Sequence, residues 1–141
     1  PNDNVDTSFR QSGFQGNSDK FHGVARFKYY GEVLDPRLTN LMIFTGGAGI
    51  RPGEKTSFDL VYHYYLQDHA SPNISGSDLT TDPVGLSKHV GSELDLIAGY
   101  QEIAALQTKF VLGYFLPGRA FADTSRDGAF LASILFRYNF Y

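Results

Sequence analysis

Charged residues of both signs recur at alternate positions in several parts of this sequence. The basic members of the pattern are Arg26, Lys28, Arg51, Lys109 and Arg137, and the acidic members are Glu32, Asp59, Glu93 and Asp95. Side chains two residues apart point to the same side of a β-strand, so each run would place its charges on one face. Arginine can hold both oxygens of a carboxylate in its planar fork, whereas lysine acts as a point charge. The pattern predicts a polar face of mixed charge, on which the basic residues could bind an anionic ligand and the acidic neighbours would moderate the affinity.

The same charges could instead form structural ion pairs with one another, as is common inside large barrels. Unpaired charge in a dry core is costly, so a face that carries both signs suggests a lined pathway and not a packed interior. A charge row that conducts a polymer must bind it weakly at each step, because tight binding would stop its passage. At the level of sequence, both interpretations of each Arg and Lys stay open.

Catalytic and metal chemistry have little support in this sequence. There is no cysteine, which excludes disulfides, thiolate ligands and thiol nucleophiles. His63 lies among Tyr62, Tyr64 and Tyr65 without further ligands at a metal-binding spacing. No nucleophile elbow or carboxylate pair organises the Ser, His and Asp residues. We therefore expect neither an enzyme nor a bound cofactor or metal, although the acidic stretch 67–90, which lacks the EF-hand spacing, could hold calcium.

Six segments with period-two alternation would position the charges. Apolar residues on one face alternate with polar residues on the other, which is the signature of a β-strand. The segments cover residues 22–34, 41–51, 57–67, 91–101, 107–116 and 129–140. Each has about ten residues, enough for a tilted strand to cross a bilayer and more than most globular strands have. The pattern predicts an all-β fold, an antiparallel transmembrane β-barrel with its aromatic face toward lipid and its charged face toward a lumen.

Composition and connections agree with this architecture. Aromatic residues make up 15% of the chain, all of them Phe or Tyr, and the last strand alternates Phe136, Tyr138 and Phe140 with polar residues. The links between the later segments alternate between short turns and longer polar loops, as in outer-membrane barrels. The net charge of −3 and the lack of a basic block argue against a nucleic-acid partner. Residues 1–21 are polar and are expected to be a loop or disordered lead-in to the barrel portion, residues 22–141.

Five stretches of the chain form a recognisable order of motifs. They are RFKYYGEVLDP at 26–36, GAGIRP at 47–52, DLVYHYY at 59–65, GSELDL at 91–96 and GYF at 113–115. In this order the chain resembles the alginate-export family of outer-membrane proteins, over residues 22–140. The resemblance implies a large antiparallel barrel with a polar, charge-lined lumen and many more strands than six. This chain would then be the C-terminal part of such a barrel, or another chain would supply the missing strands.

We therefore expect a porin-like channel in the outer membrane of a Gram-negative bacterium, exporting an acidic, alginate-like polysaccharide. Its predicted partners are an anionic polysaccharide or another anionic solute, outer-membrane lipid, and the missing strands from the same or another chain. The nine charged residues named at the start are the candidate cargo contacts. The alternative is a soluble β-barrel that binds a lipid or other apolar ligand with its aromatic faces turned inward, because the alternation is the same in both cases.

Overall fold

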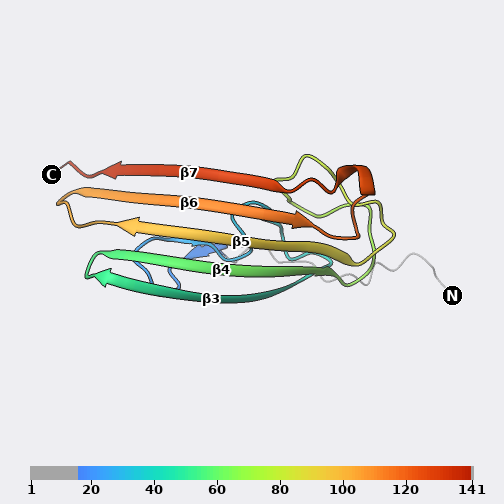
Figure 1. The fold of residues 1–141 in the computed structure, drawn as a ribbon, viewed down its shortest axis with the longest axis horizontal. Helices are drawn as coiled ribbons and strands as arrows, with labels where there is room; N and C mark the ends of the chain where they lie inside the picture. The colour runs from blue at the N-terminus through green and yellow to red at the C-terminus, as the bar shows by residue number, and fades with distance from the viewer. Residues whose placement is uncertain (1–15, 141) are drawn as a thin grey trace.

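The long strands of the protein follow one another along residues 41–138, and a bent segment precedes them (Figure 1). The computed structural model describes residues 16–140. Within these residues, five long strands form one antiparallel sheet in the order β3-β4-β5-β6-β7. They are β3 (Leu41–Gly53), β4 (Thr56–Gln67), β5 (His89–Tyr100), β6 (Leu106–Pro117) and β7 (Ala129–Tyr138). The remaining elements are the two-residue strands β1 (Ser18–Asp19) and β2 (Phe27–Lys28), which pair with each other, and the 3-10 helix η1 (Asp123–Ser125).

The alternation in sequence predicts the five long strands to within two residues at each end. Their register places apolar residues of neighbouring strands opposite one another, such as Phe44 opposite Tyr64 and Leu96 opposite Leu112. Cross-strand pairs of this kind stabilise a sheet and fix its register. The all-β, antiparallel fold class is therefore confirmed. No helix in the described part of the chain is long and apolar enough to cross a membrane.

The prediction that residues 22–34 form the first long strand is wrong. Only Phe27–Lys28 is a strand there, and most of the remainder runs as bends and turns. Gly31 has a φ of 107° and Asp35 a φ of 40°, and both values interrupt an extended conformation. These residues lie flat on the sheet. Some of their side chains face the sheet and others face away from it, and this produces the alternation of apolar and polar residues. We call residues 16–40 the inner segment.

The connections define two different ends of the sheet. Residues 54–55 join β3 to β4 and residues 101–105 join β5 to β6, and both lie at what we call the turn end. The long links, residues 68–88 and 118–128, lie at the opposite, loop end, as Figure 1 shows. The predicted alternation of short and long connections is thus present.

The two faces of the sheet differ in what covers them. One face is covered by the inner segment, drawn in blue to cyan behind the strands in Figure 1, and we call it the covered face. Its buried residues on β4–β6 include Ser57, Asp59, Val61, His63, Tyr65, Gln67, Glu93, Asp95, Ile97, Val111 and Phe115. The open face carries exposed apolar side chains, among them Met42, Phe44, Ile50, Phe58, Leu60, Tyr62, Leu94, Tyr100, Tyr114, Leu116, Phe130, Ile134, Phe136 and Tyr138.

Apolar contacts between the inner segment and the sheet form part of the core. Phe27 is 2% exposed and packs with Val61, Ile97 and Val111. Closer to the loop end, Leu34 belongs to a second cluster that includes aromatic residues of β4 and β6. Full burial of one such side chain contributes about 1.5–3 kcal/mol, so these anchors fix where the inner segment lies.

The sheet has two open edges within residues 16–140. β3 pairs only with β4, and β7 pairs only with β6. The outer two strands are also exposed on both faces over most of their length. Unpaired strand edges present a row of free N–H and C=O groups, so both edges are surfaces for pairing with further strands.

Candidate functional site

Two buried carboxylates in the middle of the covered face hold the inner segment. Glu93 accepts hydrogen bonds from the backbone N–H of Val33 at 2.7 Å and of Leu34 at 3.0 Å. Asp95 accepts one from the N–H of Glu32 at 3.1 Å. Both carboxylate side chains are at most 1% exposed, so water cannot replace these bonds. The inner segment is therefore attached through side-chain acceptors, where a strand would use a backbone ladder.

Two strand glycines allow the inner segment to approach the sheet closely. A Cβ at Gly113 of β6 would lie 2.6 Å from Cγ2 of Val33 and 2.7 Å from Oδ1 of Asp95. A Cβ at Gly99 of β5 would lie 2.7 Å from Cγ2 of Val24. Real Cβ atoms do not make contacts this short, so a side chain at either position would push the inner segment away.

Lys109 on β6 connects the inner segment to the sheet, at a position closer to the turn end than Glu93 and Asp95. Its ammonium lies 3.1 Å from Oε1 of Glu32, whose side chain is 6% exposed. The same oxygen accepts the backbone N–H of Lys28 at 3.1 Å. The Lys109 side chain is itself 24% exposed and remains accessible to solvent. Loss of either partner of such a pair leaves a poorly solvated charge, so Lys109 supports the inner segment as well as facing water.

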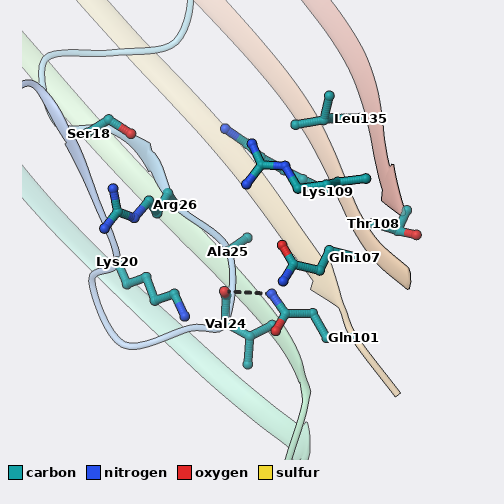
Figure 2. A pocket seen from close by; sticks show the side chains of 11 residues that line it. Ser18, Lys20, Val24, Ala25, Arg26, Gln101, Gln107, Thr108, Lys109 and Leu135 are labelled. Atoms are coloured by element: carbon teal, nitrogen blue, oxygen red, sulfur yellow. Dashed lines mark hydrogen bonds between the residues drawn. The ribbon is translucent and has the colours of Figure 1, made fainter. Parts of the chain in front are cut away.

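A cavity of about 570 Å³ opens between the inner segment and the turn-end parts of β5, β6 and β7 (Figure 2). In Figure 2, Lys20 and Arg26 stand on one side of it, and Gln101, Gln107 and Lys109 stand on the other. The full lining is Ser18, Lys20, Val24, Ala25, Arg26, Gln101, Gln107, Thr108, Lys109, Leu135 and Arg137.

The cavity has a strongly one-sided charge. Its lining, as formed by the described residues, includes four cationic side chains and no carboxylate. Arg26 lies 3.8 Å from Asp19, and the two side chains are 69% and 62% exposed, so this pair holds the guanidinium weakly. Arg137 is exposed on β7. These cations can bind carboxylates, while the side-chain amide of Gln107 can bind sugar hydroxyls.

Three of the five predicted basic residues meet in this cavity: Arg26, Lys109 and Arg137. Arg51 does not line it and instead donates from Nη2 to the carbonyl of Glu54 at 2.7 Å in the β3–β4 turn.

Lys28 also lies outside the cavity. Its ammonium is 2.6 Å from Asp35 and 3.4 Å from Asp78 of the long link 68–88. Burial disfavours the charged form, but hydrogen bonds and charge from Asp35 and Asp78 outweigh it and raise the pKa of Lys28. Lys28 is thus committed to two carboxylates of its own chain.

The four predicted acidic residues lie beneath or within the inner segment. Glu32, Glu93 and Asp95 make the bonds described above, and Asp59 is 1% exposed and packs against Gly23, where any side chain would collide with its carboxylate. In this arrangement the carboxylates contact the chain itself.

The sequence prediction missed five polar residues of the cavity: Ser18, Lys20, Gln101, Gln107 and Thr108. Lys20 falls in the stretch that was expected to be a loop or disordered lead-in. Gln101 and Gln107 flank the β5–β6 turn, on the same face as Lys109. Their position on that face was a usable signal, because a carbohydrate site needs amides as well as charges.

A sheet with an apolar open face, a polar covered face and a cationic cavity is typical of the wall of a transport barrel. The sequence model of one family, described as alginate export, matches residues 4–129, from the polar lead-in to the first residue of β7. The chain belongs to the alginate-export family, a family of transport proteins and not of enzymes. No curated protein matches the chain.

Proposed function

We propose that this chain forms part of the wall of a porin-like channel in a Gram-negative outer membrane and that the channel exports an acidic, alginate-like polysaccharide. The observation on which this rests is the open face of the sheet. Exposed aromatic and aliphatic side chains from all five long strands would be unfavourable in water, since soluble proteins seldom leave large apolar patches uncovered. In a bilayer the same face is well solvated by lipid.

Strand length supports a membrane-spanning wall. β4, β5 and β6 each have 12 residues, which corresponds to about 40 Å of extended chain. A strand tilted by about 45° needs about 9–11 residues to cross the hydrocarbon core, so these strands reach both interfaces.

The open edges support a larger closed barrel. Unpaired backbone groups are very costly in lipid, and the smallest outer-membrane barrels have about eight strands. The outer edges of β3 and β7 would therefore pair with further strands, supplied by the same protein or by another chain. Together with lipid, these strands are the partners that the wall requires.

The cationic cavity supports an anionic cargo. A polyuronate carries a carboxylate on each sugar, and exposed Arg and Lys can replace part of its hydration at modest cost. Weak, exposed contacts such as those available to Arg26 and Arg137 suit transport, because the polymer must leave each site as readily as it arrives.

The alternative, a soluble barrel with an apolar ligand inside, requires the aromatic face to be the enclosed one. In this structure the inner segment covers the polar face, and the apolar face is the exposed one. This arrangement favours the membrane channel.

Single-channel conductance of the complete protein in planar bilayers tests the proposal. We expect a stable, anion-preferring conductance that polyuronate oligomers reduce and that neutral oligosaccharides of the same length do not. A protein that stays soluble without detergent and forms no channels would reject the membrane function. A stable conductance that is indifferent to polyuronate would retain the channel and reject the cargo.

A further inference from the structure

The cationic cavity lies at one particular end of the wall. Gln101 directly follows β5, Gln107 and Lys109 lie in the first residues of β6, and Arg137 is the penultimate residue of β7. All of these positions adjoin the short connection 101–105. The cavity therefore belongs to the turn end, which in outer-membrane barrels is the periplasmic end.

The loop end has a different charge. The long link 68–88 contains Asp68, Asp78 and Asp82 against a single cation, Lys88. Three exposed arginines occur there, Arg37 of the inner segment and Arg119 and Arg126 of the second long link, and Arg126 is paired with Asp123 at 2.8 Å. A polyanion near the sheet would thus meet a cavity lined by cations and no carboxylate at the turn end, and a surface of mixed charge at the loop end.

From this asymmetry, we propose that the turn-end cavity is the capture site at which an acidic polysaccharide chain is first bound, on the periplasmic side of the membrane. The inference rests on the proposed channel function and adds a direction to it. A volume of about 570 Å³ is in the range of small-ligand sites and accommodates a short stretch of the polymer. Arg26 on the inner segment and Arg137 on β7 contact the polymer from opposite elements.

The experiment measures polyuronate block from each side of the bilayer separately. The complete protein carries either Leu86→Cys or Ile103→Cys, at exposed positions in the long link 68–88 and in the β5–β6 turn. The cysteine is biotinylated, and streptavidin added to one chamber at the end of the recording reports which end of the channel faces that chamber. We expect polyuronate oligomers to block at least about tenfold more often from the turn end than from the loop end.

Two double variants with matched chemistry locate the effect. Arg26→Gln with Arg137→Gln removes one arginine from the inner segment and one from the wall at the cavity. Arg37→Gln with Arg119→Gln removes one exposed arginine from the inner segment and one from the wall at the loop end. We expect the cavity pair to lower turn-end block about tenfold. The loop-end pair should leave turn-end block as it was.

The outcomes separate the two proposals. Equal block from both sides, or stronger block from the loop end, overturns the capture site and leaves the channel function intact. An equal effect of the two double variants overturns it as well. Absence of block from both sides rejects the anionic cargo, and the capture site with it.

Discussion

The middle of the covered face and its turn end use similar charged residues in opposite ways. In the middle, Glu93 and Asp95 are at most 1% exposed and bind backbone N–H groups of the inner segment. At the turn end, Arg26 and Arg137 are exposed and line a cavity. A buried charge must be bound by its own protein, whereas an exposed one is free to exchange partners. Solvent access, more than residue type, separates the charges that hold the fold from those that can hold a ligand.

The largest effect should come from Glu93→Ala. The change removes the acceptor of two buried backbone N–H groups and a possible acceptor of the Tyr65 hydroxyl, 3.2 Å away. At about 1–3 kcal/mol for each unsatisfied buried donor, we expect the inner segment to be destabilised by about 2–6 kcal/mol. Hydrogen exchange of residues 30–36 should accelerate, and channel conductance should rise as the segment leaves the lumen.

Glu102→Ala is the matched control for this comparison. Glu102 also accepts a backbone N–H, from Lys55 at 3.0 Å, and a hydroxyl, from Thr56 at 2.9 Å, but both bonds are exposed. Water can take over these bonds, so the change should have little effect on exchange in the inner segment. Equal effects of the two alanine variants would contradict the role of burial argued above.

A smaller effect is expected for Gly113→Val. The added side chain would collide with Val33 and the carboxylate of Asp95, and such overpacking typically costs about 1–3 kcal/mol. Protease sensitivity of the inner segment should increase, while the long strands should remain folded in detergent. Gly46→Val in β3 is the control, because nothing lies within 4 Å of a Cβ there and valine favours a strand. If Gly46→Val loosened the inner segment as much, the close approach at Gly113 would not be the cause.

The smallest effect on stability is expected for Arg137→Gln. This residue is exposed on an outer strand, and the change should alter stability by less than about 0.5 kcal/mol. Its effect should appear in polyuronate block alone. Thermal denaturation followed by circular dichroism, combined with the bilayer recordings, separates the two. A large loss of stability without a change in block would assign Arg137 to the structural group.

The wall could be predicted from the sequence, whereas the inner segment could not. Alternation predicts that a segment is a β-strand and which of its side chains share a face. Every second residue of a strand meets the same environment, as in β4 and β5. Residues 22–34 alternate too, but the hydrogen-bond acceptors for Val33 and Leu34 come from Glu93, about 60 residues further along the chain. No local pattern reports such a contact. For the same reason, alternation places Asp59, Glu93, Asp95 and Lys109 on one face of the sheet but does not separate the buried carboxylates from the exposed arginines.

The attachment of the inner segment has a consequence for how such a channel can be altered. A strand inside a sheet must keep its hydrogen-bond register with its neighbours. Adding or removing a residue in it therefore moves the side chains that follow to the opposite face. The inner segment is pinned by a few side-chain acceptors and apolar anchors and takes no part in the β3–β7 ladder. Its length and shape can therefore be changed while the wall stays in register. In the proposed channel, the bore would be a separately adjustable part, and trimming the inner segment would widen it.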